Sequence, residues 1–418
     1  MGSEWTLTTL GDLCTFLAGS AFAKKYQGNI SGEYPFIKVS DMKLAGNERY
    51  INNAKNWVSE STRAKIGAKL HPKGSLAFAK IGVALTYNRR RLLTQATILD
   101  NNMMSAIPNT NIVEYLYFYY LLKTIDFNEV VCGTSLPYLR TDDLKKIQIQ
   151  LPPLYKQRAI ANILGSLDDK LELNRKMNET LEEMAKAIFK SWFVDFDPVR
   201  AKAEGRDTGL PDEISALFPA EFEFSKKLGK SIPKGWVTVP VGDVFNLIMG
   251  QSPPGNTYNQ EGEGIPFYQG RTDFGFRFPV RRIYCKAPKR IAEQFDILVS
   301  VRAPVGDVNV ANEKCCIGRG LAALKHKSGS FSFSYYSMKN LETIFKSYES
   351  GGTVFGSINK KEFKNLIFIE PVKKLVKAFD HYIASIDKII FNNTIQINIL
   401  QELRDSLLQK LISGGIEV

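Results

Sequence analysis

Two stretches of this chain, at about 158–190 and about 379–411, carry apolar residues at helical spacing. Side chains that recur at steps of three or four predict amphipathic helices, and their repetition over several heptads indicates a coiled-coil seam. The two predicted stripes comprise Ile160, Ile163, Leu167, Leu171, Asn174, Met177, Leu181, Met184 and Ile188, and Phe379, Ile383, Ile386, Ile390, Asn393, Ile397, Leu400, Leu403, Leu407 and Leu411.

An asparagine falls near the middle of each stripe. A lone buried amide costs stability there but can fix the register of a coiled coil by pairing with an opposite amide. We therefore expect Asn174 and Asn393 to meet in an antiparallel helix pair. A helix from about 158 to 190 would be roughly 50 Å long at 1.5 Å per residue. Such a pair can separate two modules as a ruler does, although the seam alone is more typical of helices that only stiffen or dimerise a protein.

Outside these helices, short runs of β-branched and aromatic residues stand between clusters of glycine, asparagine and proline, as strands do. The runs "LAFAKIGVALTYN" and "DILVSVRAPVGDVNVAN" are examples. The stretch "VEYLYFYYLLKTI" and its counterpart "SFSYYSMKNLETIFKS" each predict a helix near the end of a module. Together these patterns predict an α+β fold.

The two halves of the chain repeat each other at their ends but not in their middles. The beginnings match at an offset of 231 residues and the ends at an offset of 219, whereas residues from about 40 to 130 barely resemble those from about 270 to 350. This distribution predicts two modules that share a scaffold and present different surfaces. The matched pairs include Trp5 with Trp236, Gly19 with Gly250, Pro35 with Pro266, Gly133 with Gly352, Asp168 with Asp387 and Asn174 with Asn393.

We therefore predict two pseudo-repeated α/β modules that are joined and separated by a long antiparallel two-helix coiled coil. The predicted order is a first module over 1–152, a central helix over 153–195, a linker over 196–235, a second module over 236–370 and a C-terminal helix over 371–418.

Charge adds a candidate partner to this architecture. The chain has 418 residues, with 55 Lys and Arg against 43 Asp and Glu, a net charge of +12 that favours a polyanionic partner, with nucleic acid first. A merely basic surface or an acidic membrane would be alternatives, but we find no basic amphipathic helix and no lipidation signal, so we expect no membrane partner. There is no apolar run long enough to span a bilayer, so a cytoplasmic protein is expected. The 5 scattered cysteines lack C-x-x-C spacing and are expected to be reduced thiols.

Nucleic-acid contacts require cations on loops for phosphates, and Arg, Lys, Asn or Gln for base edges. For any single residue a solvated surface charge remains the simpler interpretation. We expect removal of Arg90 to flatten the salt dependence of DNA binding. The candidates are Lys24, Lys25, Lys80, Asn88, Arg89, Arg90 and Arg91 in the first module, and Gln251, Gln269, Arg271, Arg281, Arg282 and Arg302 in the second.

Two Gly-Thr turns, "GTSLPYLR" (133–140) and "GGTVFGSINKK" (351–361), occur at matching places in the modules. Each could present backbone amides and a hydroxyl to a phosphate, or could simply lead into the last strand. The candidates on these turns are Thr134, Ser135, Tyr138 and Arg140, and Thr353, Lys360 and Lys361.

Signals for chemistry are missing from the chain. It has no G-x-x-x-x-G-K-[ST] loop for ATP and no glycine-rich turn for S-adenosylmethionine. "SPPG" at 252–255 has no aromatic residue to stack on a base and is interpreted as a turn. The 3 histidines are isolated and the acidic pairs lack spaced partners. The sequence therefore predicts no catalytic residue, no metal site and no cofactor bound by this chain.

These features, together with "LPPLYKQRAIANILGSLDDKLELNRKMNETLEEMAKAIFKSWFVDFDPV" (151–199) and "ALFPAEFEFSKKLGKSIPKGW" (216–236), resemble the specificity subunit of type I restriction-modification enzymes. The resemblance covers the whole chain, although the second helical region lacks an equivalent of "SWFVDFDPV". It implies two target recognition domains, each reading one half of a split, asymmetric double-stranded DNA target, with the helices setting the gap.

The resemblance also implies partners for a non-catalytic subunit. These are two modification subunits, which bind S-adenosylmethionine and methylate adenine, and two restriction subunits, which translocate and cleave DNA with ATP; Mg²⁺ is expected on partner subunits as well. The helices would dock the modification subunits. The alternative from another class is a coiled-coil scaffold with modules that bind nucleic acid nonspecifically.

The residues offer a candidate docking face for those subunits. Phe189, Trp192, Phe193 and Phe196 form an apolar cluster larger than a two-helix seam can cover. We expect a partner subunit to bury it. The alternative is that these rings pack on the chain's own modules.

Overall fold

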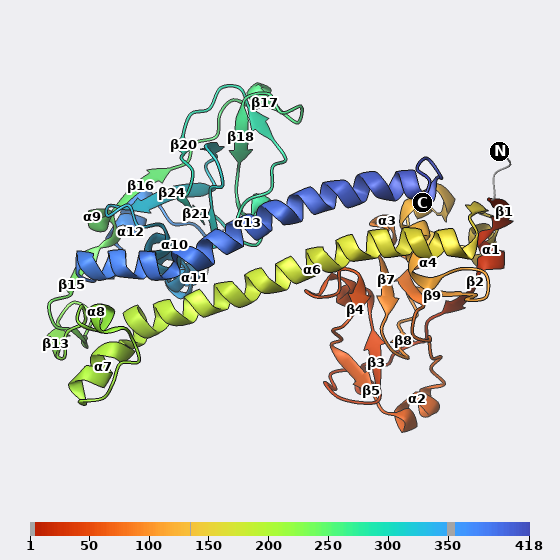
Figure 1. Cartoon of the computed structure of the whole chain (residues 1–418), viewed down its shortest axis with the longest axis horizontal. Helices are drawn as coiled ribbons and strands as arrows, with labels where there is room; N and C mark the ends of the chain where they lie inside the picture. Colours follow the sequence, from red (N-terminus) through yellow and green to blue (C-terminus); the bar gives the residue numbers. More distant parts are fainter. Residues whose placement is uncertain (1–4, 134, 349–355) are drawn as a thin grey trace. The chain divides into compact units, whose positions relative to one another are not determined.

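The contacts within the chain divide it into two units, and each of the two long helices runs through both. The computed structural model describes residues 5–133, 135–348 and 356–418. Unit 1 contains residues 1–175 and 395–418, and unit 2 contains residues 176–394. The helices are α6 (Leu154–Lys190) and α13 (Lys373–Ile412), so each unit has a strand-rich body and a segment of both helices (Figure 1).

Unit 1 is built from four groups of strands and a helix that packs against α6. In Figure 1, β3 (Tyr34–Ile37), β5 (Asn56–Val58) and α2 (Glu60–Ile66) lie farther from α6 than do β7 (Arg90–Leu93), β9 (Met103–Pro108) and α4 (Tyr115–Thr124). Short helices α1 (Leu10–Leu13), α3 (Val83–Thr86) and α5 (Thr141–Lys145) connect the strands. The strand orders are β1 (Thr6–Thr9) with β12 (Gln148–Leu151); β2 (Cys14–Ala18), β9 (Met103–Pro108), β6 (Leu76–Ala79), β7 (Arg90–Leu93) and β4 (Tyr50–Ile51); β5 (Asn56–Val58), β3 (Tyr34–Ile37) and β8 (Ile98–Leu99); and the pair β10 (Val131–Cys132) with β11 (Tyr138–Leu139).

Unit 2 repeats this plan. Its helices are α9 (Val241–Val244), α10 (Phe331–Asn340), α11 (Glu342–Ser347) and α12 (Lys360–Asn365), and α10 occupies the place of α4. The strand orders are β15 (Val237–Pro240) with β25 (Ile367–Glu370); β16 (Phe245–Met249), β24 (Leu321–His326), β21 (Ile297–Ser300) and β22 (Val308–Val310); and β17 (Tyr258–Asn259), β19 (Tyr284–Cys285), β18 (Ile265–Tyr268), β23 (Cys315–Ile317) and β20 (Ile291–Ala292).

Strand register confirms that the modules share one scaffold. Phe36 pairs with Ile98 in parallel in unit 1, as Phe267 pairs with Cys316 in unit 2. The repeated glycines have a steric reason, because a Cβ on Gly19 would lie 2.0 Å from the Asp100 carbonyl oxygen, and one on Gly250 would lie 2.1 Å from that of Gly318. The predicted α+β fold and the helices at the ends of the modules are confirmed.

Contacts between the helix segments are antiparallel within each unit, as predicted. In unit 1, Arg404 of α13 pairs with Asp168 of α6 at 2.9 Å. In unit 2, the rings of Phe379 at one end of α13 and Trp192 just after α6 have centroids 5.6 Å apart. A second contact joins Asn174 to Gln396 in unit 1 and Asn178 to Asn393 in unit 2, so within each unit residue numbers rise along one helix segment as they fall along the other.

The predicted asparagine pair is wrong in its partners. Asn174 Nδ2 donates to Gln396 Oε1 at 3.1 Å, whereas Asn393 Nδ2 donates to Asn178 Oδ1 at 2.9 Å. Sequence comparison aligns Asn174 with Asn393 as copies of each other, but copies occupy equivalent positions and need not face each other. Each amide meets the residue that the antiparallel register sets opposite it.

The predicted seam on α6 is also partly wrong. Ile163, Met177 and Met184 are exposed, the last by 51%, although they belong to the predicted stripe. The helix packs on a strand-rich body as well as on α13, and this turns its buried face toward other positions. The buried residues of α6 and the turn after it are Gln157, Ile160, Ala161, Leu164, Gly165, Asp168, Leu171, Asn174, Asn178, Glu182, Ala185, Phe189, Trp192 and Phe193.

Residues 196–235, expected as a linker, fold onto the core of unit 2. After a π-helical turn over Ser191–Asp195, the segment forms α7 (Asp197–Ala203), α8 (Asp212–Ser215) and the hairpin of β13 (Phe222–Ser225) and β14 (Lys230–Pro233). Val199 and Phe218 are buried in that core. Across the described residues, no helix combines the length and apolarity needed to span a membrane.

Candidate nucleic-acid interface

The first basic loop of unit 1 follows β2 and lies beside the end of β3. A short 3-10 helix presents Lys24 and Lys25 with exposed side chains, and Lys25 Nζ lies 5.1 Å from the centroid of the Tyr26 ring. Lys38, directly after β3, donates to Gln27 of this loop, and its Nζ lies 5.8 Å from the Phe22 ring. These contacts place three lysines around one loop, and this local positive charge suits a polyanionic ligand.

Sequence reasoning missed Lys38, although a signal for it was present. The offset of 231 residues that aligns Pro35 with Pro266 also aligns Lys38 with Gln269, which was a candidate. The structure places both directly after the equivalent strands β3 and β18.

The second cluster of unit 1 joins Lys80 to the turn at 133–140. The Leu139 N–H donates to the Lys80 carbonyl at 2.9 Å, so Lys80 lies beside Tyr138 and Arg140. Arg140 Nη2 donates to Tyr138 Oη at 3.0 Å, and this hydrogen bond raises the pKa of the exposed guanidinium. Ser135 is also exposed, whereas Thr134 lies outside the described residues.

Arg90 is not available to a phosphate, so that part of the prediction is wrong. Its side chain is 3% exposed, donates to the carbonyls of Asn88 and Ile125, and lies 4.0 Å from the Phe127 ring centroid. Burial lowers the pKa of Arg90 to about 10. The side-chain oxygen of Asn88 accepts from the Phe127 N–H, so Asn88 is structural as well.

The side chains of Arg89 and Arg91, on either side of Arg90, are more exposed than that of Arg90, because successive side chains point to opposite faces of the sheet at β7. Arg89 lies with its guanidinium carbon 4.5 Å from the Tyr87 ring centroid, and Lys43 approaches the same ring at 5.7 Å. Arg91 is half-buried and donates to the Met42 carbonyl at 3.3 Å. Lys43, Arg89 and Arg91 line a cavity of about 290 Å³, in which Glu48 is the one acidic lining residue. The other lining residues are Met42, Leu44 and Asn47.

In unit 2 the structure brings two glutamine candidates together. The Gln251 N–H donates to the Ile317 carbonyl at 3.0 Å, and Ile317 pairs with Tyr268, the residue before Gln269. Both glutamines are exposed at this end of the β18–β23 pair. Glutamine amides at one edge suit contacts to bases, because they both donate and accept hydrogen bonds.

Three arginines of unit 2 already face carboxylates. Arg271 pairs with Asp307 at 3.0 Å and Arg281 pairs with Glu313 at 2.5 Å. Arg282 pairs with the buried Asp273, whose other oxygen accepts from the Gln269 N–H. Arg282 therefore supports the loop that carries Gln269. All three arginine side chains remain more than half exposed.

The last cluster of unit 2 corresponds to the Lys80 cluster of unit 1. Arg302 forms a β-bridge with Ser357, and the Ile358 N–H donates to the Val301 carbonyl at 3.1 Å. This bridge sets the exposed Lys360 and Lys361, in the first turn of α12, near Arg302. Thr353 lies outside the described residues.

The four aromatic residues predicted to dock a partner are buried in unit 2, so the expectation that they lie uncovered is wrong. Trp192 is 2% exposed and packs edge-on against Phe218 at 5.3 Å. Phe193 and Phe196 pack on Trp236 at 5.9 and 5.5 Å. The segment after α6, α10 and α13 together cover these rings. Phe189 is buried in the same core.

Other apolar side chains of the helices are exposed instead, including Leu403, which was wrongly predicted to lie in the buried seam of α13. On α13 in unit 1 they form a stripe at steps of four, Ile395, Ile399 and Leu403, with Ile399 58% exposed. An apolar helix stripe in contact with solvent indicates an interaction site. The other large apolar side chains exposed on the two helices are Tyr155, Ile163 and Leu173 in unit 1, and Met177, Met184, Tyr382 and Ile389 in unit 2.

Within the described ranges, no three side chains of His, Cys, Asp or Glu gather in a way that could hold a metal ion. The acidic groups at the helices face arginines instead. Asp168 pairs with Arg404, and Asp387 pairs with Arg277.

Comparisons with known proteins agree along nearly the whole chain. The family model for the type I restriction modification DNA specificity domain matches residues 2–183 and 233–404. The MjaX type I restriction enzyme specificity subunit of Methanocaldococcus jannaschii is 30% identical, with 99% of this chain and 94% of that protein covered. The HindI type I restriction enzyme specificity subunit of Haemophilus influenzae is 26% identical, with 99% and 100% covered. The crystal structure of the S subunit of a type I restriction-modification system from M. genitalium has the same fold, with a TM-score of 0.61, 17% identity, and 98% and 96% of the two chains covered.

Proposed function

Because this chain belongs to the family of type I restriction modification DNA specificity proteins, we propose that it is the DNA specificity subunit of a type I restriction-modification complex. Each strand-rich body reads one half of a bipartite, asymmetric target in double-stranded DNA. The chain itself is a non-catalytic part of the complex. Methylation of adenine with S-adenosylmethionine is assigned to two modification subunits, and ATP-dependent translocation and Mg²⁺-dependent cleavage to two restriction subunits.

One observation carries this proposal: two units with one scaffold present different side chains at equivalent places. Lys38 follows β3 where Gln269 follows β18, and the Lys80 turn corresponds to the Arg302 bridge. A lysine donates only, whereas a glutamine both donates and accepts, so the two bodies favour different base edges. The gap between the half-sites is assigned to the helices, since α6 alone is about 55 Å long, against about 34–36 Å for one turn of DNA.

The proposal is tested by assembling the full chain with its modification subunits and sequencing the methylated adenines in random DNA. A bipartite motif with a fixed gap is the expected result. Methylation without a motif, or binding without sequence preference, would favour a scaffold that binds nucleic acid nonspecifically and would overturn the proposal.

Assignment of the half-sites uses loop variants. Gln251→Ala with Gln269→Ala should relax the motif in one half only, and Lys38→Ala with Lys25→Ala should relax or weaken the other half. Each mismatched contact of this kind is worth about 1–3 kcal/mol. Arg206→Ala, on the segment after α6, is the matched control and should leave both halves unchanged.

Docking of the modification subunits is assigned to the exposed apolar stripes of α6 and α13. Burial of three such side chains contributes several kcal/mol at about 25 cal/mol per Å². Ile399→Asp with Leu403→Asp should abolish capture of the modification subunit, while Glu402→Lys, an exposed polar position of the same helix, should retain it. Unchanged capture by the aspartate variant, with the chain folded, would exclude this face.

A further inference from the structure

One arginine in each unit joins the strand-rich body to the long helices. In unit 2 this residue is Arg277, in the loop that leads to β19. Its Nη1 lies 2.7 Å from Asp387 Oδ1 on α13, its Nε lies 3.4 Å from Glu182 Oε2 on α6, and the side chain is completely buried. Arg277 therefore contacts both helices from a single loop.

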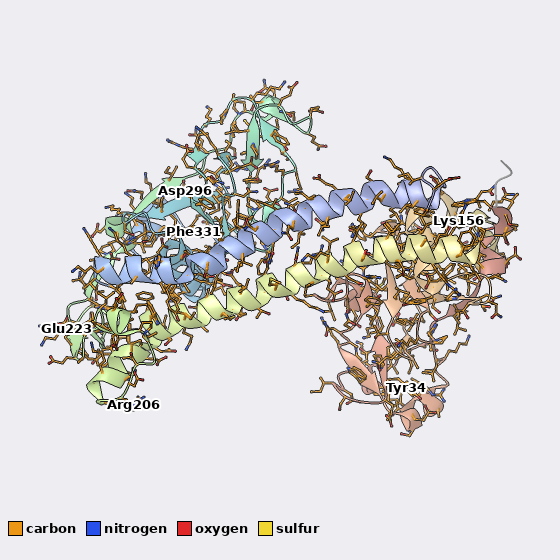
Figure 2. The ribbon with its side chains drawn as sticks, viewed as in Figure 1. Tyr34, Lys156, Arg206, Glu223, Asp296 and Phe331 are labelled. Carbon is orange, nitrogen blue, oxygen red and sulfur yellow. The ribbon has the colours of Figure 1, made fainter. Side chains whose placement is uncertain are left out.

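Tyrosines on α10 complete this junction. Arg277 Nη2 donates to Tyr336 Oη at 2.9 Å, and its guanidinium carbon lies 4.4 Å from the Tyr335 ring centroid. The ring centroid of Phe331, which Figure 2 labels at the start of α10, lies 5.7 Å from the guanidinium carbon of Arg277. The Val310 N–H donates to the Arg277 carbonyl at 2.9 Å, so the backbone of this residue is tied to the edge of the sheet.

Unit 1 has a related arrangement at the equivalent place, in which Arg49 pairs with α6 and Arg404 of α13 pairs with the neighbouring carboxylate. Arg49 Nη1 lies 2.7 Å from Asp169 Oδ1 on α6, and its guanidinium carbon lies 5.9 Å from the ring of Tyr120 on α4. Tyr120 Oη donates to Asp168 Oδ2 at 2.8 Å, and Arg404 of α13 pairs with the other oxygen of Asp168. Body, α6 and α13 thus meet at a charged junction in both repeats.

Stability alone does not account for these charges. Burial raises the pKa of the Glu182 carboxyl although Arg277 opposes the shift. A buried ion group of this kind is often no more stabilising than apolar residues of the same size. The charges instead fix the orientation of the body on the helices. Two apolar surfaces can slide over each other, whereas an ion pair flanked by aromatic rings permits one orientation of the arginine side chain.

We propose that Arg277, and Arg49 in the other repeat, are positioning residues that fix the angle of each strand-rich body on its helix segments and thereby the gap that the protein accepts between half-sites. This inference rests on the proposed function. One added base pair shifts a half-site by about 3.4 Å and rotates it by about 35°. A body held at one angle rejects that change, and a body that can swivel tolerates it.

The experiment uses the full chain in complex with its modification subunits and DNA duplexes whose gap differs from the preferred one by one or two base pairs. The test variant replaces the whole junction with apolar residues, Arg277→Met with Glu182→Leu and Asp387→Leu, which avoids leaving a buried charge unpaired. Fluorescence of the chain with Trp5 and Trp57 of unit 1 replaced by Phe, which leaves Trp192 and Trp236 buried in unit 2, checks that this unit is folded.

The preference for the correct gap over a gap one base pair longer should fall about tenfold or more, as a ratio of kcat/KM for methylation. Selection of the bases within each half-site should remain. Arg277→Lys, which keeps the charge, should recover part of the gap preference, and Arg206→Met, a surface arginine of unit 2 paired with Glu204, should change nothing.

A folded triple variant with the original gap preference overturns this inference and leaves the proposed function intact. Absence of any bipartite motif for the unmodified complex overturns both. Loss of base selection together with gap preference also overturns the inference, because it would indicate a general loss of structure in the body rather than a change of its angle.

Discussion

The arginine junctions of the two units differ in how much water reaches them. Arg277 in unit 2 faces Asp387 and Glu182, whose side chains are 9% exposed, whereas Arg49 in unit 1 faces Asp169, whose side chain is 71% exposed. In unit 1 the more buried Asp168 has a second cation, Arg404. In unit 2 one arginine thus neutralises two buried carboxylates. In unit 1 two arginines and solvent together neutralise Asp168 and Asp169.

The sheets of the two units differ in a related way. Arg90 on β7 pairs with Phe78 as Val308 on β22 pairs with Val299, so a buried arginine in unit 1 stands where unit 2 has a valine. A buried charge thus lies within the strand-rich body of unit 1, at Arg90, and at the helix junction of unit 2, at Arg277. The same scaffold therefore tolerates buried charge at different layers, provided that each charge finds partners.

The largest effect is expected from removing the arginine of each junction alone. Arg277→Met leaves two carboxylates buried without a cation and should destabilise unit 2 by about 3–5 kcal/mol, whereas Arg49→Met should cost unit 1 about 1–2 kcal/mol because Asp169 is hydrated. Urea denaturation with the fluorescence of Trp192 and Trp236 measures the first, and far-UV circular dichroism measures both. Equal losses would contradict the distinction drawn between the junctions.

Acid should destabilise unit 1 through a buried histidine, His71, at a position where unit 2 has an alanine. His71 bridges to Thr97 where Ala292 pairs with Cys315, and burial, followed by the charge of Lys69, lowers the pKa of His71 to about 4. The unfolded chain takes up a proton near pH 6.5 and the folded chain does not, so the histidine's contribution is complete above pH 6.5 and falls as the pH drops toward 4. Between pH 7 and 4.5 the loss should be about 2–3 kcal/mol.

His71→Gln removes this titration and keeps a partner for Ser105, which lies 2.7 Å from His71 Nδ1. Its free energy of unfolding should therefore vary less over the same pH range, as measured by urea denaturation. A pH dependence identical to that of the unmodified chain would show that His71 is not the group responsible.

Arg90 at the start of β7 and Arg89 directly before it should separate stability from DNA binding. Arg90→Met removes hydrogen bonds to two carbonyls and should destabilise unit 1 by about 2 kcal/mol, without changing the salt dependence of binding. Arg89→Met should leave stability unchanged and reduce the slope of log K against log salt by about 0.9. Binding titrations over a range of salt concentrations decide this, and a flatter slope for the Arg90 variant would restore the original prediction.

The smallest effect concerns the amides between the helices. Asn393→Leu leaves the buried amide of Asn178 short of a partner and should cost about 1–2 kcal/mol, whereas Asn174→Leu frees Gln396, which is exposed to water, and should cost less than about 0.5 kcal/mol. Thermal unfolding of the two variants provides the comparison. A larger loss for the Asn174 variant would reverse the order proposed for the two polar contacts.

Most of the fold could be predicted because its signals are local or repeated. Helical spacing located α6 and α13, and the alternation of strands with turns indicated the α+β bodies. The interface could be predicted only in part. Alternation along β7 could have shown that Arg90 shares a face with the buried Leu92, but no local pattern reveals that Phe218 covers Trp192 from a segment expected to be a linker.

By itself the sequence determined the duplicated frame, the two long helices, the basic excess and the family resemblance, since these depend on spacing, composition and identity along the chain. Tertiary structure alone decided which side chains are covered and which cations are open to DNA. The reason is physical: burial and pairing depend on residues far apart in sequence, as with Arg277, Glu182 and Asp387, whose meeting has no signature in any one of their neighbourhoods.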